Sequence, residues 1–285
     1  MTFTLLIRLA GPLQAWGTAS RFMHRDTDPE RPTKSGVIGL LAAADGHHRD
    51  AHDTDYPDAL PLAVLAELRF GVRADRPGVL IRDYHVVGGG RFPVRPRDLI
   101  VDPKRAEAAE RKPVENVEGA FGTVELSSWY GAPKGIHRDE SGRLQAGVTT
   151  KRMPLITNRW YLSDAAFVAA VESGDRGLLE HLANRLDRPR RMVWLGRKNC
   201  PPAEPLNHGV HDGDLESVLA RTAPLPNSTT SSPYSWVEVT QDEPDAVPVM
   251  DQPASFTSRD RVHVQRWERR RIIPPVAPTI TWETE

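Results

Sequence analysis

The chain has 285 residues, with 37 lysines and arginines against 38 aspartates and glutamates, so its formal net charge is −1. This length allows one large domain or two modest ones, at roughly 100–200 residues per domain. The hydrophobic share of 39% suffices to bury a core, which excludes a chain that is disordered throughout. The near-zero charge excludes a strongly basic, histone-like nucleic-acid binder at the level of the average.

No segment is typical of export or membrane insertion. The longest uninterrupted apolar run, 36–44, is far shorter than the roughly 20 residues of a membrane helix. The first eight residues lack a basic region and are broken by Arg8, unlike a secretory signal. Cys200 is the single cysteine, which removes intrachain disulfides and cysteine-based zinc sites. We therefore expect a cytoplasmic protein with no cofactor, no metal and no membrane contact.

The neutral average hides segregated charge. Basic residues gather in 185–198 and 259–271, whereas 45–58 is acidic and 204–216 and 238–251 are acidic without a lysine or arginine. This alternation predicts a surface that faces a polyanion beside acidic faces. Any single charged segment is explained equally well as an ordinary solvated face whose charge is balanced elsewhere on the surface.

The first half of the chain predicts a strand, a helix and two strands. Residues 2–9 are β-branched and apolar and stop before Gly11-Pro12, as a strand does. An apolar helical face then begins at Thr33 or Ser35 and ends at Gly46. Two further strands are predicted at 61–72 and 78–87.

The second half predicts an insertion and then a second run of elements. Residues 88–155 are rich in Gly, Pro and charge, which predicts an inserted, mobile or partner-ordered region. A strand at 160–171, a helix capped by Asp175 and a last strand at 191–195 follow. This element order predicts an α+β fold, a ferredoxin-like sandwich of the RRM or RAMP type.

Two domains are expected on this basis. Residues 1–210 form the ferredoxin-like domain with its long inserted thumb, and 211–285 form a small C-terminal β extension. Alternating apolar residues predict strands of the extension at 236–239 and 262–264.

The helix start at 32–36 has the chemistry of a phosphate site. Exposed N–H groups, Lys34 and two hydroxyls suit a phosphate. It is not a Walker A loop, because Thr33 and Asp28 replace the two required glycines. An ordinary capped helix explains this segment equally well.

Metal and nucleophile sites are poorly supported. His47, His48 and His52 lie in a polar loop past the helix, where nothing orients their rings toward one ion. Cys200 lies between Asn199 and two prolines, and a buried small thiol is its expected role.

Tyr84 and His85 close a predicted strand before three glycines. A histidine there is able to act as general base on an RNA 2′-hydroxyl. We favour binding, by aromatic stacking on a base, because it needs no proton-transfer geometry. A second possible catalytic group consists of Tyr130, Lys134 and His137 in the insertion.

Four segments in order resemble one family. The chain is similar to the fifth Cas protein family, the CasD subunits of type I-E CRISPR Cascade complexes, within the RAMP superfamily. A weaker echo of the family follows at 252–259. The four segments are 9–17, 32–36 with 39–43, 82–85, and 189–191 with 195–201 and 205–206.

The resemblance implies a non-catalytic antiviral RNA-binding subunit with a thumb after its third strand. Such subunits grip the 5′ handle of the mature CRISPR RNA (crRNA), cap the backbone of CasC subunits, contact the Cascade large subunit, and meet target DNA through the complex. Related type I-C subunits cleave repeat RNA, so a metal-independent CRISPR repeat endoribonuclease remains the alternative.

The resemblance also implies which residues contact the RNA handle. Arg159 falls in a T-x-R-x-Y-L pattern at 157–162. The insertion is longer than expected for the family, and Asn158 and Trp160 are not its usual neighbours there. The full expected set is Gln14, Trp16, Lys34, Ser35, Tyr84, His85, Arg159, Arg197 and Lys198.

Overall fold

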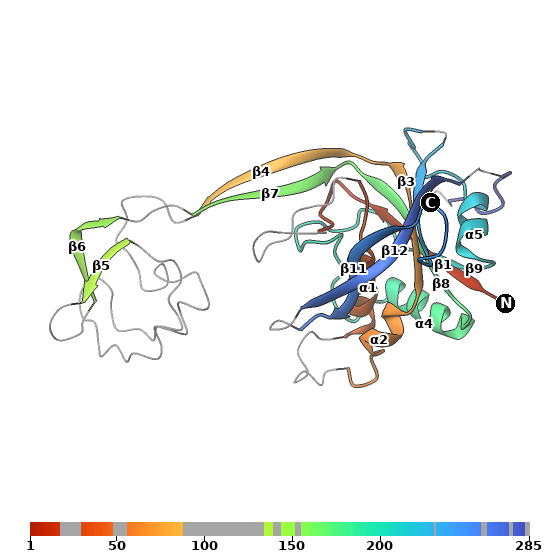
Figure 1. Cartoon of the computed structure of the whole chain (residues 1–285), viewed down its shortest axis with the longest axis horizontal. Helices are drawn as coiled ribbons and strands as arrows, with labels where there is room; N and C mark the ends of the chain where they lie inside the picture. Colours follow the sequence, from red (N-terminus) through yellow and green to blue (C-terminus); the bar gives the residue numbers. More distant parts are fainter. Residues whose placement is uncertain are drawn as a thin grey trace. The chain divides into compact units, whose positions relative to one another are not determined.

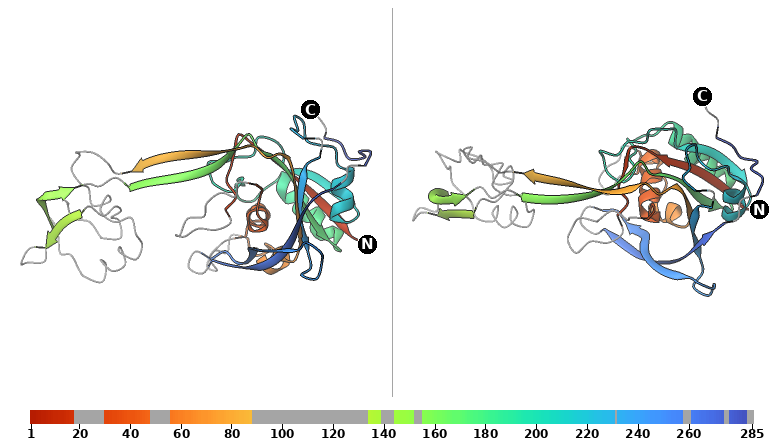
Figure 2. Two further views of the ribbon diagram at one scale, coloured as in Figure 1. Left: turned by 45° about the horizontal axis from the view of Figure 1, so that its top comes forward. Right: turned by 90° about the horizontal axis from the view of Figure 1, so that it is seen from above.

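Strands that lie far apart in the sequence build one antiparallel sheet (Figures 1 and 2). The structure is a computed structural model. It describes residues 1–17, 30–47, 56–87, 134–138, 144–151, 155–230, 232–257, 261–273 and 276–282. The strands of this sheet are β1 (Phe3–Ala10), β3 (Arg69–Arg76), β8 (Ala166–Ser173), β9 (Asn207–Asp212), β10 (Tyr234–Val239), β11 (Val247–Ser255) and β12 (Val262–Ile272). Their order across the seven-stranded sheet is β11-β12-β10-β3-β8-β1-β9.

Two smaller sheets complete the strands of the described residues. β2 (Leu13–Gln14), β7 (Leu155–Ser163) and β4 (Val79–Val87) form one, in that order. β5 (Lys134–Arg138) pairs with β6 (Leu144–Lys151) in the other.

Four helices belong to the described residues, and none of these is long and apolar enough to cross a membrane. α1 and α4 pack against each other, and α1 also contacts α2 and β11. The helices are α1 (Lys34–Asp45), α2 (Leu62–Ala66), α4 (Arg176–Asp187) and α5 (Leu215–Arg221).

Alternating side chains of β1 divide the core between the two faces of the sheet. Leu5, Ile7 and Leu9 lie in one buried cluster with α1 and α4. Leu6 and Ala10 point to the opposite face and join a smaller cluster with α5. This period of two is what a strand covered on both faces requires.

The predicted helix ends are confirmed. Thr33 caps α1, since its side chain accepts a hydrogen bond from the backbone N–H of Gly36, and Gly46 ends the helix at φ +96°. Asp175 caps α4 in the same way, accepting from Leu178 N–H. These short-range signals work because they satisfy N–H and C=O groups that a helix end leaves free.

Three predicted strands are corrected. The segment 61–72 begins as α2, because Pro61 and the Ala/Leu-rich residues after it favour a helix, and β3 starts only at Arg69. The segment 160–171 contains the end of β7 and most of β8, separated by a turn with Asp164 at φ +54°.

The third correction concerns 191–195, which forms a loop. Its Leu195 N–H donates to Cys200 O (2.7 Å) and closes a turn instead of joining the sheet. The strand expected after α4 is β9, which comes later.

The C-terminal strands do not form a domain of their own. β10 pairs with β3, and β11 and β12, the blue strands in Figure 1, continue the same sheet. The predicted boundary at 210/211 is therefore corrected. By contacts the chain divides into Met1–Arg82 with Trp160–Glu285, and Asp83–Arg159. The predicted insertion, 88–155, lies inside the second unit, and its residues 88–133, 139–143 and 152–154 lie outside the described residues.

Gly196 is expected to be essential for the loop after 195. Its φ is +93°, and a Cβ there would lie 1.8 Å from the carbonyl oxygen of Ala15. Gly196→Ala should lower the free energy of unfolding by about 1–3 kcal/mol through backbone strain, with the clash adding to it. Urea denaturation measures this. Gly174→Ala is the control, because nothing lies within 4 Å of its Cβ position; equal midpoints for the two variants would contradict the expectation.

Candidate nucleic-acid interface

The loop 195–200 is a fixed platform on the larger unit. Ala15 N–H donates to Leu195 O (2.9 Å), and Cys200 N–H donates to Arg197 O (2.9 Å). With the close approach of Gly196 to Ala15, these bonds hold the loop against the segment that follows β1. Arg197 and Lys198 therefore lie on an ordered turn.

The side chain of Arg197 is held by β7. Its Nη1 donates to Trp160 O (3.3 Å), and its Cζ lies 5.0 Å from the ring centroid of Tyr161. Tyr161 is buried, and its hydroxyl accepts from Asn199 Nδ2 (2.9 Å). A guanidinium that lies on a ring in this way is pre-organised and loses little entropy when it binds an anion.

A second arginine–aromatic pair lies beside it in the same unit. Arg82 Cζ is 6.0 Å from the ring centroid of Trp160. Arg82 and Lys198 are exposed, whereas Trp160 and Arg197 are half-buried. We call Arg82, Trp160, Arg197 and Lys198 the Arg197 surface. It combines planar cations with a half-buried ring, groups of the kind that bind phosphates and stack on bases.

Sequence reasoning missed Arg82 and Trp160 as members of this surface. Both lie next to motifs that it did single out, Tyr84-His85 and Arg159. The available signal was the presence of arginine and tryptophan beside those motifs, on strands that a hairpin would bring together.

The second unit holds three of the expected residues. The His85 ring is hydrogen-bonded to the Asp83 carboxylate, two residues away on the same side of β4. Tyr84 lies on the other side and is exposed, and Arg159 is exposed as well. A histidine oriented by a carboxylate is able to serve either as a base or as a hydrogen-bonding group.

The other catalytic candidates are not tested by the structure. Lys134 and His137 lie on β5, and their side chains are not among the described ones. Tyr130 lies outside the described residues, as do His48 and His52. Among the described residues, no group of three metal-ligating side chains occurs.

The structure corrects the RNA-contact role expected for Gln14 and Trp16, because both side chains are buried. Gln14 Nε2 donates to Leu9 O (2.9 Å) and Ala165 O (2.8 Å), and Gln14 Oε1 accepts from Trp16 Nε1 (2.8 Å). Both side chains have all their hydrogen-bonding partners inside the protein. They fix the chain after β1 against Ala165, the residue that precedes β8.

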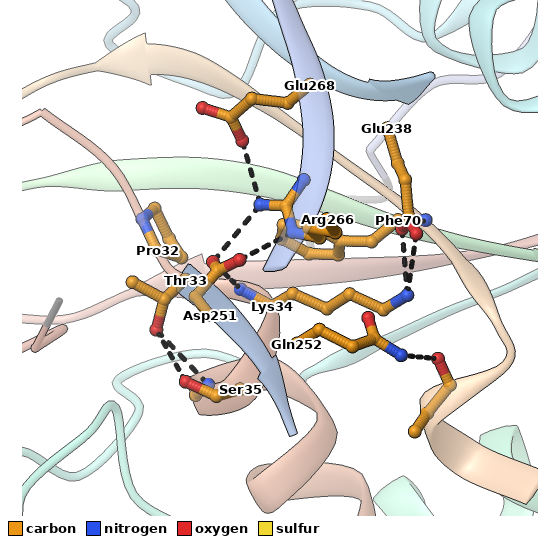
Figure 3. Close-up of polar contacts among 12 residues, drawn as sticks. Pro32, Thr33, Lys34, Ser35, Phe70, Glu238, Asp251, Gln252, Arg266 and Glu268 are labelled. Carbon is orange, nitrogen blue, oxygen red and sulfur yellow. Dashed lines mark hydrogen bonds and ion pairs between the residues drawn. The ribbon is translucent and has the colours of Figure 1, made fainter. Parts of the chain in front are cut away.

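Lys34 and Ser35 require the same correction (Figure 3). Lys34 is 1% exposed, and its Nζ donates to Glu238 at 2.8 and 3.0 Å. Ser35 is buried next to Thr33. The anion at this helix start is internal, because the backbone N–H of Lys34 donates to the carboxylate of Asp251 (2.8 Å). The expected phosphate site is thus occupied by a side chain of β11.

Asp251 belongs to a network of three cations and three carboxylates, in which every member is buried except the half-buried Glu238. Arg266 Nη2 donates to Asp251 (3.1 Å) and Glu268 (2.8 Å), and Arg31 donates to Glu268 as well. We call Arg31, Lys34, Glu238, Asp251, Arg266 and Glu268 the α1 charge network.

Burial and neighbouring charge set the protonation of this network. Burial alone would raise the pKa of Asp251, but the charge and hydrogen bonds of Arg266 and the charge of Arg31 outweigh it and lower that pKa. Burial lowers the pKa of Lys34, although Glu238 opposes the shift. Burial alone would also lower the pKa of Arg266, but Asp251 and Glu268 raise it.

Much of the basic block 185–198 is likewise used inside the protein. Arg185 Nε donates to Asp45 (3.2 Å), Arg190 pairs with Asp58, and Arg191 Nε donates to Gly46 O (3.1 Å). These contacts close the C-terminal end of α1, where cations offset the helix dipole. Only part of this block is therefore available to a polyanion.

Cys200 has the structural role expected for it. The side chain is buried, and burial raises the pKa of its thiol above the ordinary value. A thiol of this kind is a poor nucleophile.

The comparisons with known proteins agree with one another. The model of a family described as CRISPR-associated protein (Cas_Cas5) matches residues 4–271. The chain is 28% identical over 268 residues to the CRISPR system Cascade subunit CasD of Escherichia coli (strain K12), covering 90% of this chain and 93% of that protein.

Two solved structures are similar over nearly the whole chain. One is a crystal structure of a Cas protein, with 31% identity, a TM-score of 0.59, and coverage of 96% of this chain and 99% of that one. The other is a CRISPR RNA-guided surveillance complex, with 25% identity, a TM-score of 0.60, and coverage of 98% and 93%.

Asp251→Asn should destabilise the protein at neutral pH. It should also make the unfolding free energy depend less steeply on pH in the acid range. Removing one charge from a buried pair costs about 3–5 kcal/mol, because its partners stay buried. A carboxylate whose folded pKa is lowered contributes stability above its unfolded value of about 3.9, and this is lost as pH falls through the lower folded pKa. Urea unfolding between neutral and acid pH measures both effects.

The matched control is Asp242→Asn, in the exposed turn after β10. It should leave the unfolding free energy at neutral pH nearly unchanged. If the unfolding free energy falls as steeply at acid pH in Asp251→Asn as in the unmodified protein, the role of Asp251 is contradicted.

Proposed function

The chain belongs to the CRISPR-associated protein (Cas_Cas5) family, and we propose that it is a crRNA-binding subunit of a type I-E Cascade surveillance complex that grips the 5′ handle. The similarity to a Cascade subunit and to a CRISPR RNA-guided surveillance complex supports this function. The observation that assigns this function to a site is the Arg197 surface. Its two arginines lie near aromatic rings, and they are joined there by a half-buried tryptophan and a lysine, on an ordered loop and the strands β4 and β7.

The chemistry of this surface suits a short single-stranded RNA end. Guanidinium groups and Lys198 bind phosphates and give an affinity that falls with salt. The half-buried ring of Trp160 offers a stacking partner for an unpaired base. In the second unit, Tyr84, His85 and Arg159 offer similar groups and belong to the same proposed RNA-binding set.

The topology supports a ferredoxin-like unit of the RAMP type. Taken alone, β1, β3, β8 and β9 stand in the order β3-β8-β1-β9, with α1 after β1 and α4 after β8. This is the arrangement of a βαββαβ sandwich with both helices on one face. The β4 and β7 strands fall between the second and third strands of that unit, where a thumb is expected.

The proposed partners follow from assembly membership. We propose that the protein caps a backbone of CasC subunits, contacts the Cascade large subunit, meets target DNA through the complex, and works in the cytoplasm. It acts as a binder and not as an enzyme. The alternative, a metal-independent repeat endoribonuclease, rests on the His85–Asp83 pair; we rank it second because the Arg197 surface has cations and a ring but no general base.

Loss of either cation of the loop, Arg197 or Lys198, should weaken binding of handle RNA. Arg197→Ala and Lys198→Ala should each reduce the affinity of the protein for an RNA with the 5′ handle. The slope of log K against log salt should fall by about 0.7 for each phosphate contact removed. Fluorescence anisotropy at several salt concentrations measures both quantities.

Two controls accompany this test. Arg197→Lys keeps the charge but loses the stack on Tyr161, so it should be intermediate. Arg176→Ala removes an exposed arginine on α4 that pairs with Glu180 and Asp212, and should bind normally. Unchanged affinity and slope in both alanine variants would argue against the Arg197 surface.

The purified protein should not cut labelled repeat RNA in EDTA. A binder requires no proton transfer, so gel analysis should show full-length RNA throughout. The opposite result, a site-specific cut that His85→Ala abolishes, would replace the binder by the endoribonuclease.

A further inference from the structure

The basic run at the end of β12 is not used by the Arg197 surface. Arg269 contacts Glu243 (3.3 Å) and Arg271 contacts Glu216 (3.6 Å) on one side of the strand. Arg270 points to the opposite side, where its guanidinium lies against aromatic rings. It is the member of the run that combines exposure with a fixed geometry.

The rings beside Arg270 come from the neighbouring strand β10. Arg270 Cζ lies 4.2 Å from the ring centroid of Tyr234 and 5.3 Å from that of Trp236. Trp236 is the direct cross-strand partner of Arg270. Trp236 is buried and supports the stack from below, whereas Tyr234 is 47% exposed.

Within the described residues, the charge of Arg270 is only weakly compensated. Its side chain is 48% exposed, and within the described residues its ion pair is a loose one, 3.7 Å from the half-exposed carboxylate of Glu30. Exposed pairs at such distances are worth little and exchange readily. The guanidinium thus keeps N–H donors for another acceptor.

The pairing of a cation with an exposed ring selects the class of ligand. An acidic peptide matches the charge but leaves the ring of Tyr234 unused. A single-stranded nucleic acid presents a phosphate and an unpaired base in alternation, which match a guanidinium and a ring side by side.

We propose that Tyr234 and Arg270 form a second contact for single-stranded RNA, with a base stacked on Tyr234 and a phosphate bound by Arg270. The inference rests on the proposed RNA-binding function but uses a different strand pair, β10 and β12. It gives the basic segment 259–271 a role through one arginine.

Anisotropy with the full chain tests the proposal, using a mixed-sequence single-stranded RNA, the same RNA with abasic residues, and the matching DNA. Arg270→Ala should weaken RNA binding by about 5-fold and reduce the salt slope by about 0.7. Tyr234→Ala should weaken binding to the RNA by about 5-fold or more and leave the abasic RNA unaffected. Tyr234→Phe should bind as the unmodified protein does.

Arg176→Ala is the matched control, because its side chain is 47% exposed. Circular dichroism first shows that the variants are folded. Three outcomes would then overturn the proposal: normal RNA binding by both Arg270→Ala and Tyr234→Ala, an equal loss of binding in Arg176→Ala, or a loss of binding seen only with DNA. Arg197→Ala, measured with handle RNA in the same assay, separates the two hypotheses. If Arg197→Ala binds RNA more weakly and Arg270→Ala binds normally, the proposed function stands and the second contact is excluded. If Arg270→Ala binds RNA more weakly and Arg197→Ala binds normally, the Arg197 surface is excluded instead.

Discussion

The carboxylate of Asp251 at the start of α1 is the contact on which the arrangement of the larger unit depends. It accepts from the backbone N–H of Lys34 and from Arg266, so it joins β11, β12 and the first helix at one point. Its neighbours Arg31 and Glu268 extend the α1 charge network. A buried charge is tolerated only when its partners are in place, so these elements must dock together or not at all. This explains why the last three strands are part of the sheet and not a separate domain.

How much of the fold could be predicted from the sequence depended on the range of the interactions. The caps of α1 and α4 were predictable, because Thr33, Gly46 and Asp175 act on backbone groups within a few residues. β1 and β4 were also predicted, from short β-branched and apolar runs. Apolar alternation located β10 and the first residues of β12, but β11 was not predicted. The segments 61–72 and 191–195 were misassigned, because short apolar runs fit helix, strand or loop until tertiary contacts decide among them.

The site was predictable in part, for a related reason. Residue chemistry pointed to Lys34 as a phosphate ligand, but the chain supplies its own anion from Asp251, more than 200 residues away. No local pattern reveals such a partner. Arg197 and Lys198 were proposed from the family resemblance, and the structure places them on a glycine-marked turn, with Arg197 half-buried and Lys198 exposed. Trp160 and Arg82 emerged only when β4 and β7 were placed in one sheet.

The balance of 37 basic against 38 acidic residues is consistent with RNA binding once the internal pairs are considered. Arginines such as Arg73, Arg185 and Arg266 are used to hold strands, helix ends and loops together. The arginines left at the surface do not need a strong overall field, because stacking on Tyr161 or Tyr234 already orients them. A protein organised in this way recognises a short RNA by the placement of a few planar cations and rings, and its acidic faces limit non-specific attraction to other nucleic acids.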